Sequence, residues 1–247
     1  MTHPSNAGDV ISRLPSLRDV IAAHALGAKK SLGQHFLLDS NLTARIARAA
    51  GDLALGTTIE IGPGPGGLTR ALLAARATRL LAIETDRRCI QALGDLVAAF
   101  PDRLALVEAD ALRVDPCALA RERDWPPPYQ IVANLPYNVG TALLLGWLKH
   151  ATAYQSMTLM FQREVADRLT AAPGGKDYGR LSIHVQWLCA TRRLFDVSPK
   201  AFVPPPSVWS AVVRIEPRPV PLAPARDASL ERVLAAAFNQ RRKMLRG

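Results

Sequence analysis

The tetrapeptide Asn134-Leu135-Pro136-Tyr137 holds residue types suited to chemistry on an aromatic amine. The nitrogen of such an amine is a poor nucleophile because its lone pair is delocalised into the ring. The side-chain oxygen of Asn134 and the carbonyl of Leu135 can accept both N–H protons, which draws the nitrogen toward tetrahedral geometry. Pro136 would fix the turn, and Tyr137 would offer a π-face to a base. We therefore predict catalysis by positioning and electrostatics, without a strong general base.

An ordinary turn at a strand end, in which Asn caps and Pro bends the chain, is the competing interpretation of this tetrapeptide. It is the better one for an isolated N-x-P-Y, and a glycine-rich segment about seventy residues earlier reverses that preference. Residues 60–67, Glu-Ile-Gly-Pro-Gly-Pro-Gly-Gly, lie between a predicted strand and a predicted helix. Glycines let a ligand press against the backbone, so we expect a binding turn here and not merely a tight connection.

Two cofactor fingerprints fit this turn. Gly62, Gly64 and Gly67 satisfy the dinucleotide pattern G-x-G-x-x-G. The first two glycines together with Gly66 equally fit the E/D-x-G-x-G-x-G turn of Rossmann-like methyltransferases. In both patterns an acid at the end of the second strand binds ribose hydroxyls, and Glu84 holds that position.

Residues further along separate the two fingerprints. Asp110-Ala111 follows the third predicted strand, where an acid can accept a hydrogen bond from the adenine amino group that both cofactors carry. The Asn134 turn follows the fourth strand, and dehydrogenases do not require it. We therefore favour a methyl donor over a nicotinamide cofactor. Asp86, two residues after Glu84, is the weaker candidate for the ribose ligand.

These segments must be positioned by regular elements, and the sequence indicates alternating strands and helices. The expected strands are 57–61, 80–83, 104–107, 129–133 and 156–161. The expected helices are 40–50, 68–75, 88–100, 139–150 and 163–170. This alternation predicts an α/β fold whose mostly parallel sheet has helices on both faces. Segments 181–188 and 210–215 look extended, and we expect an antiparallel pair at one edge of the sheet.

The charge of the chain indicates a polyanionic partner. The formal net charge is +10, and basic residues gather at Lys29-Lys30, Arg87-Arg88, Arg192-Arg193 and Arg241-Arg242-Lys243. Lys and Arg release condensed counterions from phosphates, which points to nucleic acid. A basic, well-solvated enzyme is the alternative.

Several classes of protein are disfavoured. No apolar run approaches a membrane span, and residues 1–16 lack the apolar core of a secretory signal. Cys89, Cys117 and Cys189 are odd in number and lack zinc spacing. We expect reduced thiols, no metal and a soluble cytoplasmic protein.

Three regions are expected along the chain. Residues 1–28 form an N-terminal arm with a helical pattern at 17–26, and residues 29–216 form the Rossmann-like domain. Residues 217–247 are a proline-rich linker followed by a helix at 230–238. That helix would begin a small helical RNA-recognition domain, which we expect to be truncated.

Seven ordered segments make the chain similar to a known family, the KsgA/RsmA small-subunit ribosomal RNA adenine N6,N6-dimethyltransferases, which share a fold with the Erm resistance methyltransferases. The resemblance covers about Lys29 to Arg246. The segments are residues 30–37 (Lys-Ser-Leu-Gly-Gln-His-Phe-Leu), the glycine turn, 82–84, 110–111, 134–137, 202–208 (Phe-Val-Pro-Pro-Pro-Ser-Val) and 238–243 (Phe-Asn-Gln-Arg-Arg-Lys). The fold implied is a Rossmann-like class I methyltransferase sheet with a C-terminal helical domain.

The resemblance also implies residue roles. The catalytic set would be Asn134, Leu135, Pro136, Tyr137 and Phe202. The residues that bind S-adenosyl-L-methionine would be Gln34, His35, Leu37, Gly62, Gly64, Glu84, Asp110, Ala111 and Asn134. The RNA-binding set would be Arg241, Arg242 and Lys243.

Phe202 is implied to stack on a flipped base opposite Tyr137. Core packing is the alternative for Phe202, and a solvated helix end is the alternative for the basic run. The common family pattern G-Q-N-F has Asn where this chain has His35, so the contact made by His35 stays open.

The implied reaction is dimethylation of two adjacent adenosines in the 3′-terminal hairpin loop of 16S ribosomal RNA. The substrate would be an assembling 30S particle and the enzyme a monomer. One alternative is an assembly factor for which RNA binding is the main activity. A second is an Erm-like enzyme acting on large-subunit RNA, and a dehydrogenase is the weakest alternative.

Overall fold

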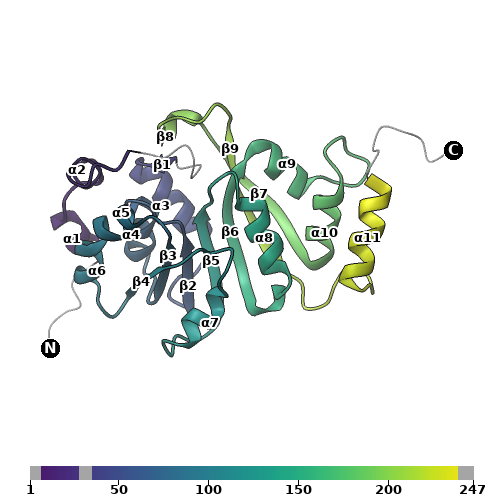
Figure 1. Ribbon diagram of the computed structural model, residues 1–247, viewed down its shortest axis with the longest axis horizontal. Coiled ribbons are helices and arrows are strands. Elements are labelled where there is room, and N and C mark those ends of the chain that lie inside the picture. The colour runs from purple at the N-terminus through teal and green to yellow at the C-terminus, as the bar shows by residue number, and fades with distance from the viewer. Residues whose placement is uncertain (1–6, 28–34, 239–247) are drawn as a thin grey trace.

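The computed structural model describes residues 7–27 and 35–238, and these form an α/β structure around one large sheet (Figure 1). The described residues give seven strands in the spatial order β4-β3-β2-β5-β6-β9-β7. Their bounds are β2 (Thr57–Ile61), β3 (Leu80–Glu84), β4 (Leu104–Glu108), β5 (Tyr129–Asn134), β6 (Tyr154–Gln162), β7 (Cys189–Val197) and β9 (Ser210–Pro217). The five strands from β4 to β6 pair in parallel, and β9 runs antiparallel between β6 and β7.

Helices cover both faces of this sheet, as expected. One hydrophobic core joins the sheet to α7 (Pro116–Arg121), α8 (Gly140–Leu148), α9 (Arg163–Thr170) and α10 (Arg180–Leu188). The other core joins it to α1 (Ala7–Arg13), α3 (Ser40–Ala49), α4 (Gly67–Ala74) and α6 (Gly94–Ala99). Every residue of β2 and β3 is buried, as a central parallel strand covered on both faces requires.

The expected extended segment at 181–188 is wrong, because these residues form the helix α10. The alternating apolar positions favoured a strand, but burial follows helical spacing, with Ser182 and Val185 both fully buried. The Ser182 hydroxyl accepts from the Gly179 N–H at 3.0 Å and donates to the Arg168 carbonyl at 2.6 Å. This cap and the packing against α9 override the local pattern.

The edge strand that pairs with β9 is β7, which directly follows that helix. The expectation of an antiparallel pair involving 210–215 is therefore right, with a different partner. Charged side chains interrupt the alternation of apolar and polar residues along β7. One of them, Arg193, forms ion pairs with Asp167 and Asp196.

Smaller elements were not all expected. The predicted helix at 88–100 is two helices, α5 (Arg87–Ala92) and α6, which are separated at Leu93. A two-stranded pair of β1 (Phe36–Leu37) and β8 (Phe202–Val203) joins segments that lie far apart in the sequence. The remaining elements are α2 (Leu17–Ala23), α11 (Asp227–Phe238) and the short 3-10 helices η2 (Ala151–Ala153) and η3 (Pro199–Ala201).

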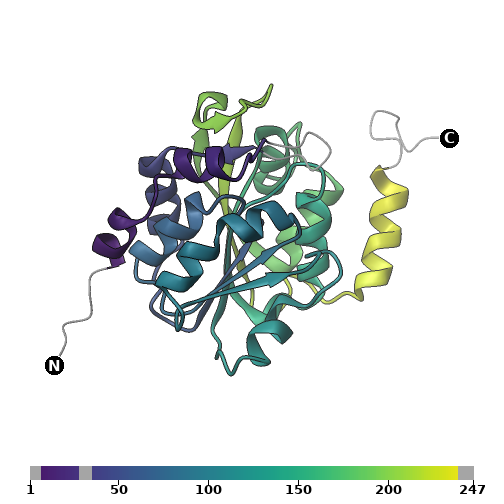
Figure 2. The same ribbon diagram turned by 60° about the vertical axis from the view of Figure 1, so that its left-hand side comes forward.

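Figures 1 and 2 place the helices α1 and α2 at one end of the molecule and α11 at the other. The carbonyl of Pro15, in the arm, accepts from the Arg70 guanidinium of α4 at 2.8 Å. At the far end, His184 of α10 lies 2.9 Å from the Asp227 carboxylate of α11. No helix in the described part of the chain has both the length and the hydrophobicity of a membrane span.

Candidate active site

The parallel strands end at one edge of the sheet, and a cavity of about 330 Å³ lies there. Its lining brings together segments that follow β2, β3, β4 and β5, together with residues of β1. Of the predicted site residues, the cavity is lined by His35, Leu37, Gly62, Gly64, Glu84, Asp110, Ala111, Asn134, Leu135, Pro136 and Tyr137. The same physical rule explains the gathering, because the carboxyl ends of neighbouring parallel strands meet at a single edge.

The glycine turn adopts backbone conformations that favour glycine. Gly62, Gly64 and Gly66 have φ angles of 67°, 55° and 93°. A Cβ at Gly64 would also lie 3.3 Å from the ring of Phe36, which is a tight contact. The turn therefore exposes backbone to the cavity and leads directly into α4.

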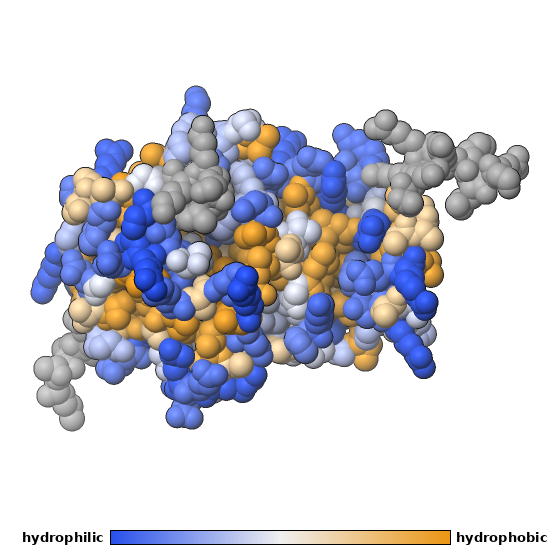
Figure 3. All heavy atoms as spheres, in the orientation of Figure 1, coloured by the Kyte–Doolittle hydropathy of each residue, from blue (hydrophilic) through white to orange (hydrophobic). Residues whose placement is uncertain are grey.

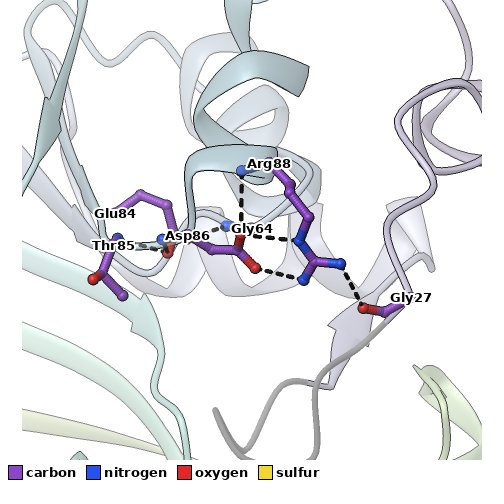
Figure 4. A network of polar contacts seen from close by, with 6 residues as sticks. All are labelled: Gly27, Gly64, Glu84, Thr85, Asp86 and Arg88. Carbon is purple, nitrogen blue, oxygen red and sulfur yellow. Dashed lines mark hydrogen bonds and ion pairs between the residues drawn. The ribbon is translucent and has the colours of Figure 1, made fainter.

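Glu84 is held in place by backbone donors (Figure 4). Its Oε1 accepts from the N–H groups of Thr85 and Asp86 at 2.8 and 2.9 Å, and its Oε2 accepts from the Gly64 N–H at 3.1 Å. The residue is 6% exposed, so it is not a solvated loop acid. Asp86 instead caps α5 and pairs with the Arg88 guanidinium at 2.7 Å, which supports its lower rank as a ribose ligand.

At the end of β4, Asp110 and Ala111 form the adjoining wall. The Asp110 Oδ1 accepts from the Leu112 N–H at 2.9 Å. Its other oxygen lies 3.4 Å from the Arg113 side chain. Asp110 is exposed, so its carboxylate remains accessible to a polar group that enters the cavity.

Asn134 ends β5 with its side chain already oriented. Its Nδ2 donates to the backbone carbonyl of His35 at 3.1 Å, which leaves the side-chain oxygen as an acceptor. Leu135 is 2% exposed. The Tyr137 hydroxyl lies 2.5 Å from the Ser210 hydroxyl on β9, and burial raises the pKa of this tyrosine. Hydrogen bonds thus hold the side chains of Asn134 and Tyr137, the first and last residues of the tetrapeptide.

His35 lies close to two aromatic rings. Its ring centroid is 5.3 Å from that of Tyr137 and 6.3 Å from that of Phe202. The His35 Nδ1 hydrogen-bonds with the Pro204 carbonyl at 2.9 Å. Phe202 is 2% exposed and belongs to the same hydrophobic core as Leu37. It does not line the cavity.

Four predicted site residues lie outside the described part of the chain. They are Gln34, Arg241, Arg242 and Lys243. Within the described residues, no group of three or more His, Cys, Asp or Glu side chains is placed to hold a metal ion.

Glu60 is a cavity residue that the motif spacing did not assign to a role. It is 1% exposed, its Oε2 has no hydrogen-bond partner among the described residues, and it contributes to the cavity lining. Burial raises its pKa to about 8; the Thr69 hydroxyl opposes this rise and the negative charge of Glu84 adds to it. The first position of the glycine motif was the available signal.

Comparison with known proteins agrees with this geometry. Residues 25–247 match the profile of the ribosomal RNA adenine dimethylase family. The chain belongs to that family. A curated relative, ribosomal RNA small subunit methyltransferase A of Rhodospirillum rubrum, is 62% identical over 94% of this chain and 79% of its own length. The protein of the same name from Ruegeria sp. is 57% identical over 96% of this chain and 84% of its own length.

Solved structures show the same fold. A dimethyladenosine transferase from Plasmodium falciparum superposes with a TM-score of 0.70 at 27% identity, covering 85% of this chain and 73% of its own. The 23S ribosomal RNA methyltransferase ErmE gives a TM-score of 0.63 at 31% identity, covering 81% and 76%. The predictions of a methyltransferase of this family and of a Rossmann-like sheet are confirmed, and a dehydrogenase is excluded.

Proposed function

We propose that this methyltransferase uses S-adenosyl-L-methionine to dimethylate the N6 amine of two adjacent adenosines in the 3′-terminal hairpin loop of 16S ribosomal RNA, within an assembling 30S particle. The orientation of Asn134 carries the proposal. The Asn134 amide nitrogen donates to the His35 carbonyl, so the side-chain oxygen of Asn134 is free to accept an N–H of the target amine. The Leu135 carbonyl would accept the second N–H.

The residues on the cavity wall fit this cofactor. Glu84 would accept the ribose hydroxyls, and Asp110 with Ala111 would hold the adenine. Gly62 and Gly64 present bare backbone to the methionyl part, and the buried carboxyl oxygen of Glu60 lacks a partner of its own among the described residues. When bound, the cofactor supplies an electrophilic methyl group on a sulfonium.

The protein then acts by holding the amine. In the first methyl transfer both N–H groups are accepted, so the nitrogen lone pair would point toward the methyl group, and Tyr137 would support the face of the base. The monomethylated amine keeps one N–H, which one of the two acceptors would hold in the second transfer. The hydroxyl contact with Ser210 restrains the Tyr137 ring. The methylated amine is acidic enough to lose its proton to water, so no general base is required.

Large-subunit RNA is the less favoured substrate. The relatives at 56–62% identity are named small-subunit methyltransferases, whereas the 23S enzyme shares 31% identity. An assembly factor with secondary catalysis remains testable, because a catalytically inactive variant that fully restores subunit assembly would favour it.

The decisive experiment is to map the modified base. Undermethylated 30S particles incubated with labelled S-adenosylmethionine should gain label on two adjacent adenosines of 16S RNA. Asn134→Ala should lower the rate on the order of 10²-fold, since it removes a polar group that acts in the transition state. Asn41→Ala, an exposed asparagine on α3, is the matched control and should retain the rate. Absence of label from 16S RNA, or an unchanged rate in Asn134→Ala, would contradict the proposal.

A further inference from the structure

Trp209 is an exposed tryptophan in the loop between β8 and β9, with 48% of its surface accessible to solvent. Val203 and Val208 of the same loop are exposed as well. By contrast, Trp187 is buried, and its indole N–H donates to the Ala223 carbonyl at 2.7 Å. The Trp209 indole makes no hydrogen bond and no ring contact within the part of the chain that the structure describes. Apolar surface gathered in one loop points to a partner that covers it.

The loop lies at the edge of the sheet that carries the cavity (Figure 1). Ser210, the first residue of β9, pairs with Gln162 at the end of β6 and with Val197 at the end of β7. The Ser210 hydroxyl contacts the Tyr137 hydroxyl at 2.5 Å, so the Cα of Trp209 lies within roughly 10 Å of the Tyr137 oxygen. Trp209 does not line the cavity, but it stands beside the residue proposed to support the target base.

The backbone around Trp209 is held in place. Its carbonyl accepts from the Arg163 N–H at 2.8 Å, and the next residue begins β9. The three prolines of residues 204–206 fix φ along the loop, and the last of them is buried. A ring presented on a restrained backbone loses little conformational freedom on binding.

The exposed charges around the loop are positive. Arg163, at the start of α9, and Lys200, in η3, are both exposed. The 3.9 Å contact of Arg163 with the Asp167 carboxylate is long for an ion pair. The acidic side chains of the neighbouring elements each form a closer ion pair with another arginine, as Glu164, Asp167 and Asp196 do. This arrangement favours a partner that carries phosphates.

A target base that leaves its stack uncovers the base next to it. Enzymes that act on an extruded base also contact the flanking nucleotides. The proposed substrate carries two adjacent adenosines, so one of them lies beside the slot while the other is methylated. Unstacked bases of RNA loops stack on aromatic side chains of proteins, and Trp offers a large face for this contact.

We propose that Trp209 stacks on the base next to the target adenosine, with Arg163 and Lys200 attracting the phosphates of the same RNA segment. Trp209 is then a positioning residue for the RNA and takes no part in the methyl transfer itself. The inference rests on the proposed function, because it takes an RNA with an unpaired target base as the substrate.

Steady-state methylation of undermethylated 30S particles by the full chain tests the stacking. Trp209→Ala should raise KM for the particle roughly 5- to 100-fold, the range that loss of one base–aromatic stack produces. The kcat at saturating particle and the affinity for S-adenosylmethionine should stay within about twofold of wild type, because the ring touches neither the cofactor nor the reacting amine.

Two further substitutions at the same position identify the partner. Trp209→Phe keeps an aromatic face and should recover most of the affinity, whereas Trp209→Leu keeps only apolar area and should not. Leu55→Ala is the matched control, because Leu55 is an exposed hydrophobic residue before β2, at the opposite edge of the sheet, and KM should not change. If Trp209→Leu restored KM as fully as Trp209→Phe, the partner would be an apolar protein surface of the particle, and base stacking would be overturned.

Particles rebuilt with abasic nucleotides locate the stacked base. Each carries 16S RNA in which one neighbour of the target adenosine, on its 5′ or its 3′ side, lacks the base. When the stacked base is absent, wild type and Trp209→Ala should have the same KM. When the other base is absent, the difference between the two proteins should persist. A difference of the same size on both particles would overturn the inference.

The outcomes separate this inference from the proposed function. If wild type places no label on 16S RNA, the proposed function fails and the inference with it. If wild type labels 16S RNA and Trp209→Ala has an unchanged KM, only the role of Trp209 is overturned. A lower affinity of Trp209→Ala for S-adenosylmethionine would mean that the ring supports Ser210 and the cavity wall, and would also overturn the stacking role.

Discussion

His35 stands where the cofactor cavity meets the pair of aromatic residues implied to hold the base. Its carbonyl orients Asn134, and its ring lies near both Tyr137 and Phe202. The hydrogen bond between its Nδ1 and the Pro204 carbonyl ties the same side chain to the loop after β8.

Phe202→Leu tests whether the ring stacks on the base. Leu fills most of the same volume, so the free energy of unfolding should fall by less than about 1.5 kcal/mol. Turnover on 30S particles should fall while S-adenosylmethionine affinity stays unchanged, since stacking on a base contributes only to RNA binding. Urea unfolding, calorimetry and rate measurements check this. Normal turnover in a protein of lower stability would make Phe202 a core residue only.

Glu60 predicts a pH dependence for the stability of the cofactor-free protein. Its folded pKa of about 8 lies above the ordinary value of 4.5, so the folded state holds more protons between these values. The stability associated with this group is complete below pH 4.5 and is lost as the pH rises toward 8, by on the order of 3–5 kcal/mol. Urea unfolding of wild type and Glu60→Gln from pH 5 to 8.5 should show the difference shifting in favour of the variant as the pH rises. Parallel curves would contradict it.

At the scale of elements, the pairing of β1 with β8 and the packing of β1 on α4 complete one wall of the cavity. Leu37 lines the cavity. A Cβ added at Gly67 would lie only 2.5 Å from the Leu37 carbonyl oxygen. The beginning of α4 therefore depends on a residue without a side chain, independently of the positive φ angles of the preceding turn.

Gly67→Ala should thus separate β1 from α4. The added methyl group meets backbone that cannot rotate away, so we expect a loss of about 1–3 kcal/mol in the free energy of unfolding and weaker cofactor binding. Gly146→Ala in α8 is the matched control: a Cβ there has no neighbour within 4 Å, and the change should stabilise the helix by about 0.5–1 kcal/mol. Chemical denaturation of both variants measures the contrast. Equal effects would mean that the close approach is unimportant.

At the scale of the whole molecule, the net charge of +10 favours association with RNA. Figure 3 shows hydrophobic residues gathered in the middle of one face, over the region of α8, with hydrophilic residues around them. The basic run at 241–243, which lies outside the described residues, stays a candidate for phosphate contact.

Arg241→Glu/Arg242→Glu should weaken RNA binding most at low salt and leave cofactor affinity unchanged. For every phosphate that the protein no longer neutralises, the slope of log K against log salt should become shallower by about 0.7–0.9. The matched control is Arg123→Glu/Lys149→Glu, which alters two exposed cations. They precede β5 and β6, at the edge of the sheet opposite the cavity. Salt titrations of RNA binding compare the two. The same slope in both double variants would remove the basic run from the interface.

Local patterns were sufficient for most strands and for many of the residues that line the cavity. The residues after β2, β3, β4 and β5 could be assigned because strand order in a parallel sheet brings their carboxyl ends together whatever the details of packing. The segment at 181–188 could not, because its alternation suits a strand while the cap at Gly179 and Ser182 and the packing on α9 select a helix.

The sequence by itself determined the family, the sheet and the residue types at the cavity, since motif spacing and strand–helix alternation are local properties. Only the tertiary structure decided the state of Glu60 and the surroundings of His35. Glu60 has a raised pKa because burial and Glu84 act on it together, and His35 meets Phe202 because β1 pairs with β8 across most of the chain. Burial and long-range pairing depend on how distant segments pack, and no spacing within one segment encodes them.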